Sequence, residues 1–471
     1  MRVERTDVVI VGAGPTGLLL AGDLAAAGVA VTVLERRPAH ESNLTRAFAL
    51  HARSLEVLDA RGLADDVVST GARVGELRFL DRLRIDLSWL PSRFPYVLVT
   101  PQYQTERLLE GRAVKHGAEI LRSHEVLDVQ QDDDGVDVRT DHATWRASYV
   151  VGTDGVRSSV RTAIGAPFPG RTVVSSVMLA DVRLADDPPD VVTANADGRT
   201  FGFVAPFGDG WYRVIAWHRD HQLPDNAPVE LDEIRSTIKQ ALGTDYGITE
   251  VRWMSRFHSD ERQVPRYRVG RVFLAGDAAH VHSPAGGQGM NTGLQDAANL
   301  GWKLAAHVQG WAPPGLLDSY HAERHPVGRM VLRTSGGILR VAFMGPVLLP
   351  LASAVLRTAV RLRPVARRAA GTVTGIAIRY PQPPGSPRLA GRRAPDVPLA
   401  GGGRLYEVLR EGTFVLIAAG GIGDSDHLRV VVPAQPDHPT TLVRPDGYVA
   451  WAASNPGASE VRQALADWCV A

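Results

Sequence analysis

The chain has 471 residues, with 52 basic and 51 acidic side chains and a formal net charge of +1. At roughly 100–200 residues per domain, this length predicts two to four folding units. Apolar residues make up 44% and charged residues 22%, which is typical of a globular protein and argues against global disorder. The balanced charge gives no electrostatic reason to expect nucleic acid as a partner. Cys469 is the single cysteine, which excludes disulfide frameworks, cysteine-ligated zinc and dithiol redox chemistry, so we expect a reducing cytoplasm.

The N-terminal part of the chain predicts a strand, a helix and a second strand. Residues 7–11 form an apolar run of buried-strand length, residues 18–27 have helical composition, and residues 29–34 form the second strand. Parallel strands need a crossover helix, so this pattern indicates a βαβ unit. Two later apolar runs, at 149–152 and 272–275, also end in a turn made of glycine and aspartate.

The remaining chain predicts a second sheet, a helical region and a separate C-terminal part. Residues 173–260 alternate apolar and polar, which predicts half-buried antiparallel strands. Residues 290–308 predict a long helix. A proline-rich linker at 380–387 leads to short strands at 414–418 and 428–432, a hairpin around Asp446-Gly447 and a helix at 458–468.

The longest apolar stretch is Val341–Leu356, which is bounded by arginines and contains two prolines. It is shorter than the ~20 residues that a membrane-spanning helix needs, so no span is predicted. Five arginines follow between 357 and 368, which leaves contact with an anionic lipid surface as an alternative. We expect a buried or capping helical hairpin instead.

Residues 12–17, Gly-Ala-Gly-Pro-Thr-Gly, fit the pattern G-x-G-x-x-G between the first strand and the first helix. Gly12 permits the turn, Gly14 allows a pyrophosphate to approach the backbone, and Gly17 lets the helix pack on the strand. Glu35 ends the second strand, where an acidic side chain can bind ribose hydroxyls. Together these features predict dinucleotide binding; a glycine-rich turn without a ligand is the alternative.

Two further motifs resemble those of a known enzyme family. Residues 276–305, GDAAHVHSPAGGQGMNTGLQDAANLGWKLA, resemble the second FAD motif of the class A FAD-dependent aromatic monooxygenases, the superfamily of p-hydroxybenzoate and phenol hydroxylases. Residues 153–161, TDGVRSSVR, are similar to that family's Asp-Gly motif, which is linked to FAD and NAD(P)H binding. Residues 51–54, 101–109 and 442–451 look like the aromatic polyketide hydroxylase and rifampicin monooxygenase-like group.

The resemblance implies roles for individual residues toward FAD. Asp277 would bind the ribityl chain, Arg46 and Gln102 would contact the flavin, Arg107 would lie near the pyrophosphate, and the main chain of Val126 would contact adenine. A turn or helix-capping aspartate is the alternative for Asp277. The full set of expected FAD-binding residues is Gly12, Gly14, Pro15, Thr16, Gly17, Glu35, Arg36, Arg46, Gln102, Arg107, Val126, Asp154, Asp277, Pro284, Gly287, Gly289, Met290 and Asn291.

A physical argument supports the last of these residues independently. A helix that begins at residues 289–291 would direct its N–H groups at the pyrimidine edge of the flavin, where the reduced ring carries negative charge. Side chains beside the ring must be small, and residues 285–287 are alanine and glycine.

The chemistry implied by the resemblance is hydride transfer from NAD(P)H, O₂ addition to give a C4a-hydroperoxyflavin, and hydroxylation of a bulky polycyclic aromatic or phenolic compound such as a polyketide or antibiotic. There is no second dinucleotide motif, so NAD(P)H would bind transiently. We assign no side chain as catalytic acid or base, and expect no metal. Candidate substrate residues, each of which could equally serve packing, are Phe201, Phe203, Phe207, Trp211, Tyr212 and Arg213.

The predicted fold class is α/β, with a Rossmann-type FAD-binding domain, an interleaved antiparallel substrate sheet and a C-terminal domain that resembles thioredoxin but lacks C-x-x-C. The open alternatives are Baeyer–Villiger oxygenation of a quinone or ketone, a flavin reductase or halogenase of the same fold, and drug sequestration without turnover. We expect a monomer or homodimer. The predicted boundaries are 1–73, 98–172 and 262–330 for the FAD-binding domain, 74–97 and 173–261 for the substrate domain, 331–385 for a helical segment and linker, and 386–471 for the C-terminal domain.

Overall fold

A computed structural model describes residues 3–39, 47–79, 83–206, 210–283, 286–345, 347–382, 386–420 and 422–468. Its largest sheet has eight strands, in the order β17-β18-β11-β1-β2-β8, with β10 beside β11 and β9 beside β10. Strands β18, β11, β1, β2 and β8 run parallel, which confirms the predicted βαβ start. The strand bounds are β1 Val3–Val11, β2 Val31–Glu35, β8 Glu119–Arg122, β9 Val126–Gln131, β10 Val136–Thr140, β11 Thr144–Gly152, β17 Arg268–Val269 and β18 Val272–Leu274.

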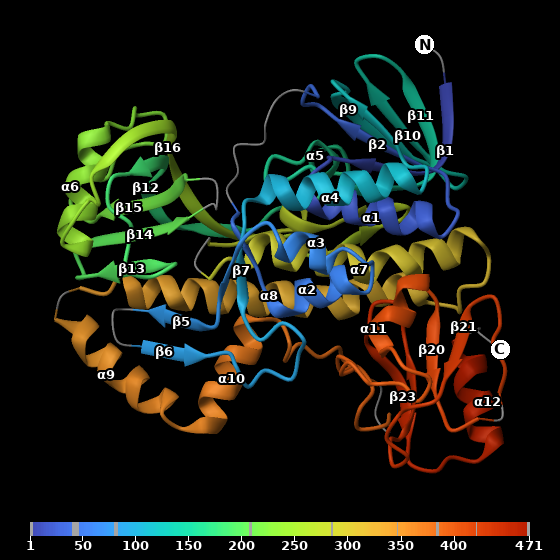
Figure 1. The fold of residues 1–471 in the computed structure, drawn as a ribbon. Coiled ribbons are helices and arrows are strands. Elements are labelled where there is room, and N and C mark those ends of the chain that lie inside the picture. The colour runs from blue at the N-terminus through green and yellow to red at the C-terminus, as the bar shows by residue number, and fades with distance from the viewer. Residues whose placement is uncertain are drawn as a thin grey trace.

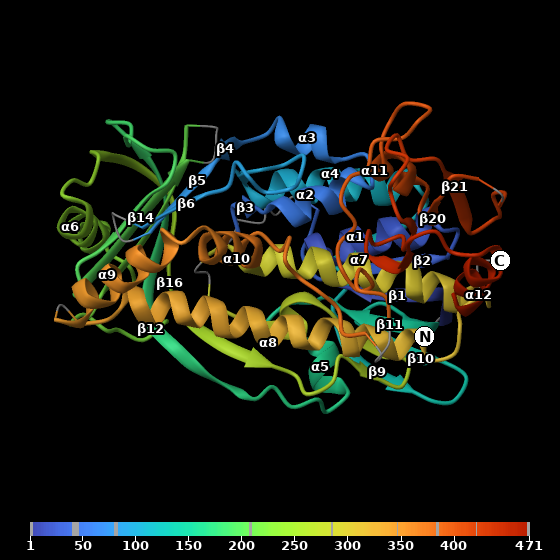
Figure 2. The same ribbon diagram turned by 90° about the horizontal axis from the view of Figure 1, so that it is seen from below.

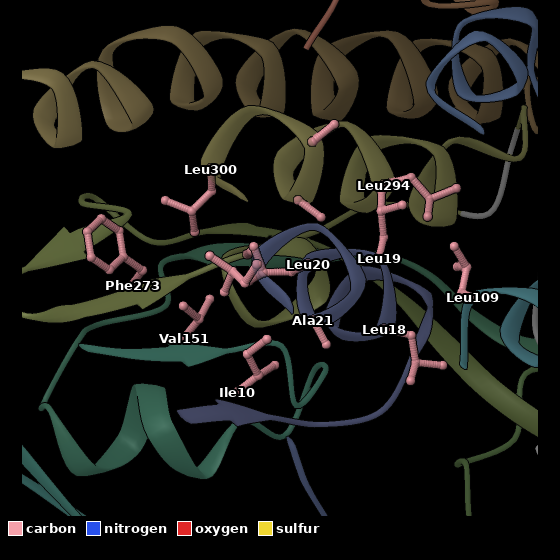
Figure 3. Close-up of a cluster of buried hydrophobic side chains, with 14 of the residues drawn as sticks. Ile10, Leu18, Leu19, Leu20, Ala21, Leu109, Val151, Phe273, Leu294 and Leu300 are labelled. Carbon is pink, nitrogen blue, oxygen red and sulfur yellow. The ribbon is translucent and has the colours of Figure 1, made fainter. Parts of the chain in front are cut away.

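Helix α1 lies at the centre of the main hydrophobic core. Figure 3 shows α1 between the strands that carry Ile10 and Val151 and helix α7, which carries Leu294 and Leu300. The run Leu18–Ala21 is apolar on every side of α1, and it is fully buried because sheet and helices enclose it. The helices around this core are α1 Pro15–Ala26, α2 Ala52–Asp59, α3 Ala64–Val68, α4 Gln102–Lys115, α5 Ser159–Ala163, α7 Gln288–Val308 and α8 Leu316–Ala342.

A six-stranded sheet forms the other end of the elongated molecule (Figure 1). Its strand order is β13-β14-β15-β12-β16-β19, antiparallel throughout, as the alternation over 173–260 predicts. Helix α6, Leu231–Leu242, covers one face, and an aromatic cluster lies on the other. The strand bounds are β12 Gly170–Leu184, β13 Thr193–Ala196, β14 Thr200–Pro206, β15 Tyr212–His218, β16 Ile248–Gln263 and β19 His280–Val281.

A two-stranded sheet and a helical hairpin lie below this end of the molecule in Figure 1, and a three-stranded sheet lies towards its middle. A three-stranded sheet has the order β3-β7-β4, and β5 pairs with β6. Helices α9 and α10 pack against β6 and each other (Figures 1 and 2). They form the predicted hairpin, but only one side of it is buried. The bounds are β3 Ala49–Leu50, β4 Ala72–Val74, β5 Glu76–Phe79, β6 Leu83–Asp86, β7 Val97–Val99, α9 Leu348–Val360 and α10 Arg363–Val373.

The C-terminal unit is a four-stranded sheet with the order β21-β20-β22-β23 and helices beside it. Only β20 and β21 are parallel, and β22 and β23 form the hairpin predicted around Asp446-Gly447. The mixed α/β fold class is confirmed. The bounds are α11 Leu405–Val408, η2 Leu409–Glu411, β20 Phe414–Ile417, β21 Leu428–Val431, β22 Thr440–Val443, β23 Val449–Ala453 and α12 Ala458–Asp467.

Buried charges join the C-terminal unit to helices α7 and α8, in a cluster that we call the buried junction: Asn299, Lys303, Glu323, Arg444 and Asp446. Arg444 Nη1 donates to Glu323 Oε1 at 2.7 Å, and Lys303 Nζ donates to Glu323 Oε2 at 2.7 Å. Asn299 Nδ2 donates to Asp446 Oδ2 at 3.2 Å, and Arg444 also pairs with Asp446. The pKa of Lys303 is lowered to about 8, because the effect of burial is larger than the opposing attraction to Glu323.

Among the described residues, no helix combines the length and the apolar character needed to cross a membrane.

Candidate functional site

The three motif turns meet at one edge of the eight-stranded sheet, because each follows the carboxyl end of a parallel strand: β1, β11 and β18. The Thr153 hydroxyl donates to the carbonyl oxygen of Gly12 at 2.9 Å, which joins the first two turns. The amide of Ala275 donates to the carbonyl of Gly152 at 3.0 Å, which joins the second and third. Residues more than 100 positions apart therefore form one site.

The first turn has the geometry of a phosphate cradle. Gly12 has a φ of +104°, and a Cβ there would come within 2.7 Å of the Thr153 carbonyl oxygen. A Cβ on Gly17 would collide with the carbonyl of Gly12. Gly14 differs: a Cβ there would meet no atom of the described residues within 4 Å. Since the fold itself does not require glycine at position 14, the open space is suited to a ligand.

The start of α1 is open to an anion. Pro15 occupies the first turn of α1, where its missing N–H is no loss, and Gly14 gives the helix no side-chain cap. The N–H groups of this turn therefore have no side-chain partner at the cap among the described residues, which suits them to an anion. Thr16 packs against the third turn, because a Cβ on Gly276 would come within 2.8 Å of its hydroxyl.

Glu35 lies beside the glycine turn, as its position at the end of β2 predicts. Its Oε2 accepts a hydrogen bond from the Ala13 amide at 2.8 Å, and its Oε1 accepts one from the Arg37 amide at 2.9 Å. Burial opposes ionisation, but the hydrogen bonds from Arg37 and Ala13 outweigh it and keep the pKa of Glu35 below its usual value. Arg36 is exposed; the sequence interpretation missed that Arg37 is the arginine in contact with Glu35.

Val126 belongs to the same corner of the site. The chain just before it is hydrogen-bonded to the residues that follow β2, with the Ser123 amide donating to the Arg37 carbonyl at 3.2 Å and the His124 amide donating to the Glu35 carbonyl at 3.0 Å. The Val126 side chain itself is buried in the main core, which leaves only its backbone for a ligand.

Asp154, in the second turn, has a buried carboxylate oxygen without a partner. Its Oδ2 accepts from the Val160 amide at 3.1 Å, whereas Oδ1 has no hydrogen bond among the described residues. Burial raises the pKa of Asp154, in part offset by hydrogen bonds from Ser158 and Val160. Arg161, not singled out as a site residue, joins this turn to the third by donating to the Ala278 carbonyl at 3.1 Å.

The third turn presents Asp277 outward. Asp277 is exposed, forms no hydrogen bond within the described parts of the chain, and lies near the start of α7, since a Cβ on Gly289 would be 3.9 Å from its Oδ1. A turn or helix-capping aspartate would accept backbone hydrogen bonds, so that alternative has no support here.

Asp296 holds the third turn from behind. It is fully buried on α7, and its Oδ2 accepts from the Gly276 amide at 3.1 Å and lies 2.7 Å from His280 Nε2. Arg324 Nε donates to its Oδ1 at 2.7 Å. Burial opposes ionisation, but Arg324 and His280 keep the pKa of Asp296 below its usual value. Sequence reasoning missed Asp296 and Arg324, although Asp296 lies inside the quoted motif.

The N-terminus of α7 faces the same space. Gly286 and Gly287 adopt φ values of +84° and +63°, which glycine tolerates, and the N-cap residue Gly287 has no side chain with which to cap the helix. Asn291 is committed to the protein: its Oδ1 accepts from the His51 amide at 2.8 Å, and its Nδ2 donates to the Ala49 carbonyl at 2.9 Å. Met290 is buried in the main core, so residues 289–291 offer backbone rather than side chains.

His51 is a buried histidine at this site that the sequence interpretation did not select. Its ring lies beside Gly287, and its Nδ1 has no hydrogen bond among the described residues. Burial lowers the pKa of His51 to about 4. The signal that points to it in the sequence is the tetrapeptide His-Ala-Arg-Ser at residues 51–54, which resembles the family's sequence.

The other expected FAD contacts divide into two groups. The Gln102 amide donates to the Ala47 carbonyl at 3.3 Å, which places the start of α4 beside β3, while its side chain donates to Glu106 at 2.8 Å. Arg107 is exposed on α4 without a hydrogen bond to a described residue. Arg46 and Pro284 lie outside the described residues, as does the substrate candidate Phe207.

Two of the substrate candidates lie on the face of the six-stranded sheet opposite α6. The ring centroids of Phe203 and Phe48 are 5.2 Å apart, and Phe48 immediately precedes β3. Phe201 meets Phe343, at the end of α8, at 5.8 Å. This aromatic face therefore reaches the segment that also contains His51.

The other candidates are engaged with charged neighbours. Arg213 is fully buried, and its Nε donates to Asp181 Oδ1 at 2.6 Å. The guanidinium of Arg252 lies 4.7 Å from the Trp211 ring. Tyr212 donates its hydroxyl to an exposed aspartate, Asp187, at 2.7 Å.

Residues 5–335 match the family described as FAD binding domain, and residues 387–471 match the family described as aromatic-ring hydroxylase, C-terminal. The chain belongs to this FAD-binding family, which confirms the family predicted from the motifs. It is a flavin-dependent monooxygenase with FAD as its cofactor. The open cradle at Gly14, the partnerless oxygen of Asp154 and the exposed Asp277 all fit FAD.

Individual relatives cover almost the whole chain. It is 42% identical to rifampicin monooxygenase of Streptomyces venezuelae over 95% of each chain, and 37% identical to dialkyldecalin synthase of Streptomyces rugosporus over 98% of each. Among solved structures, an anhydrotetracycline hydroxylase from Streptomyces rimosus aligns with a TM-score of 0.88 and 37% identity, covering 99% of each chain.

Proposed function

We propose that the protein hydroxylates a bulky polycyclic aromatic or phenolic compound, a polyketide or an antibiotic, with NAD(P)H and O₂ as co-substrates. The observation that carries the proposal is the meeting of three motif turns with the open N-termini of α1 and α7, close to an aromatic face. The relatives named for rifampicin and anhydrotetracycline support a polycyclic substrate.

The residues of the three turns would hold FAD from the adenine to the flavin ring. The N–H groups at the start of α1 suit the pyrophosphate, and Glu35 suits a ribose hydroxyl. Asp277 can accept hydrogen bonds from the ribityl chain, and the free N–H groups of α7 can stabilise negative charge at the pyrimidine edge. FAD supplies the redox chemistry when bound; the protein binds and orients it.

The aromatic face would position the substrate beside the flavin. Phe48, Phe201 and Phe203 can stack against a polycyclic ring system and exclude water from the reacting edge. Arg213 is paired with Asp181, which suits a positioning role for this sheet rather than proton transfer. We assign no acid or base, since a phenolic substrate can ionise unaided.

We infer a cytoplasmic enzyme that acts as a monomer or homodimer without nucleic acid. The FAD-binding role falls to 1–73, 98–172 and 262–330, and the substrate role to 74–97 and 173–261, while 331–385 is a helical segment with a linker and 386–471 is a C-terminal domain.

The first experiment measures anaerobic flavin reduction by NADPH, with and without a panel of polycyclic phenols that includes a rifamycin and a tetracycline. We expect one compound to accelerate reduction strongly and, with ¹⁸O₂, to yield a product that has gained one labelled oxygen atom. A product of unchanged mass would contradict the insertion of oxygen. A rate of flavin reduction that none of the compounds changes would contradict the proposed hydroxylation.

A glycine substitution tests the cradle separately. In Gly14→Ala, the added methyl group meets no protein atom, so we expect a folded protein whose dissociation constant for FAD rises about tenfold or more. Gly111→Ala on α4, where a Cβ is equally unobstructed, is the matched control and should bind FAD normally. Equal FAD affinity of the two variants would contradict the placement of the pyrophosphate at this turn.

A further inference from the structure

Helices α9 and α10 expose large apolar side chains to solvent, on a surface that we call the α9–α10 surface. Of the thirteen large hydrophobic side chains exposed among the described residues, six lie here within 19 consecutive positions. The most exposed is Val347, at 85%. Clustered apolar exposure of this kind marks an interaction site more often than scattered single residues do. The six residues are Val347, Leu348, Leu351, Val355, Leu362 and Val365.

The geometry of α9 explains why these side chains form one stripe. Leu348, Leu351 and Val355 follow the spacing i, i+3, i+7, which places them on one side of a helix. They are 59–65% exposed, whereas Leu349 on the inner side is 6% exposed. A helix that is apolar on both sides is expected to be covered on both, yet this chain covers only the side that faces β6.

The stripe lies in a part of the chain that is rich in positive charge. No acidic residue occurs between Glu323 and Asp396, and that interval holds thirteen arginines, in a chain whose net charge is only +1. Four of these arginines, on α10 and the turn before it, are exposed and have no carboxylate partner among the described residues: Arg361, Arg363, Arg367 and Arg368.

We propose that the α9–α10 surface docks on the surface of an anionic lipid bilayer. Leucine and valine side chains can enter the boundary between headgroups and acyl chains, while the flanking arginines pair with lipid phosphates. A second copy of the chain is a poorer occupant, because symmetric contact would bring the arginines of both copies together. Docking needs no membrane-crossing helix.

The position of the surface gives docking a consequence for the enzyme. Helices α9 and α10 pack on β6, its partner β5 contacts β13, and β13 is the edge strand of the six-stranded sheet (Figures 1 and 2). A docked protein would therefore hold the sheet that carries the aromatic face near the bilayer, where apolar polycyclic compounds accumulate. Lipid binding itself does not depend on the proposed function.

The test is flotation of the FAD-loaded full-length protein with vesicles of phosphatidylcholine alone or with 30% phosphatidylglycerol. We expect binding at least about tenfold tighter to the anionic vesicles, weakened by 0.5 M NaCl. Leu351→Asp/Val355→Asp should abolish flotation. Arg361→Glu/Arg363→Glu should weaken it by more than about tenfold, since each arginine near the surface contributes about fivefold.

The controls carry the same chemical changes elsewhere on the surface. Leu389→Asp/Val432→Asp alters an exposed leucine and an exposed valine of the C-terminal unit, and Arg139→Glu/Arg462→Glu reverses two exposed arginines outside this region; both should float like the wild type. Circular dichroism verifies that each variant is folded. Equal binding to neutral vesicles, no binding to either vesicle, or a dimer in solution that Leu351→Asp/Val355→Asp dissociates would each overturn the proposal.

Discussion

The buried junction and the α9–α10 surface depart from the usual distribution of side chains in opposite directions. The junction places Lys303, Glu323 and Arg444 where water does not reach, whereas α9 and its flanks expose valine and leucine. The two regions differ in whether other residues of the chain pair with or cover these side chains. Every charge of the junction has an opposite charge within the same chain, while nothing described in this chain covers the outer side of α9.

The two regions should therefore differ in how much they contribute to the stability of the fold. Buried charges are strongly destabilising when one partner is removed, so the junction should be sensitive to single substitutions. Exposed apolar side chains contribute little to folding, so the α9–α10 surface should tolerate them.

The largest effect is expected for Glu323→Gln. Lys303 and Arg444 would remain buried with only Asp446 to balance them, so we expect the free energy of unfolding to fall by about 3–5 kcal/mol. Denaturant titration of the full chain measures it. Asp232→Asn, which removes an exposed carboxylate beside Arg235, is the control and should change stability by less than about 1 kcal/mol. Equal losses for both variants would contradict the contrast.

His51 extends the contrast to a buried group without a compensating charge. Burial lowers its pKa from 6.5 to about 4. Between these pH values the unfolded chain binds a proton that the folded chain does not, so the free energy of unfolding falls as the pH drops through this window. Over the whole window, this lowered pKa of His51 changes the free energy of unfolding by about 3 kcal/mol.

Denaturation of the flavin-free protein at pH 6.5, 5 and 4 checks this dependence. His51→Gln should lose about 2–3 kcal/mol less than the wild type over that range, because the group that takes up the proton is gone. His142→Gln, at an exposed position, should keep the wild-type dependence. A His51→Gln profile parallel to that of the wild type would show that acid destabilises the protein through other groups.

The smallest effect is expected on α9. Leu351→Ser replaces a side chain that is 65% exposed, so the free energy of unfolding should change by no more than about 0.5 kcal/mol in the absence of lipid. Leu349→Ser on the inner side of the same helix, at 6% exposure, is the matched comparison and should lose at least about 2 kcal/mol. If Leu351→Ser matched that loss, the outer face of α9 would have to be covered in solution.

The sequence was sufficient for features that depend on local geometry. The turns at Gly12, Asp154 and Asp277 each follow a short apolar strand, and parallel strands bring such turns to one edge. It was insufficient for pairs that only the tertiary fold brings together. Arg444 and Glu323 are 121 positions apart, and nothing near Glu323 identifies its partner.

The sequence also did not show in which direction individual side chains point. The motif identified Asn291 but not that its amide group joins β3 to α7, because Ala49 of β3 is 242 positions away. The arginines after Val341–Leu356 were visible in the sequence, but which side of the hairpin they would accompany depended on where β6 packs.

Arg444 also constrains how the C-terminal unit can be inherited. Its guanidinium lies within 6 Å of the rings of Trp302, Tyr380, Tyr448 and Trp468, which come from α7, the segment before the unit, and the unit itself. A chimera that took this unit from a relative would have to keep a glutamate at position 323 for the incoming arginine to be neutralised. Exchange between family members is therefore limited by matching charge at the seam as well as by matching shape.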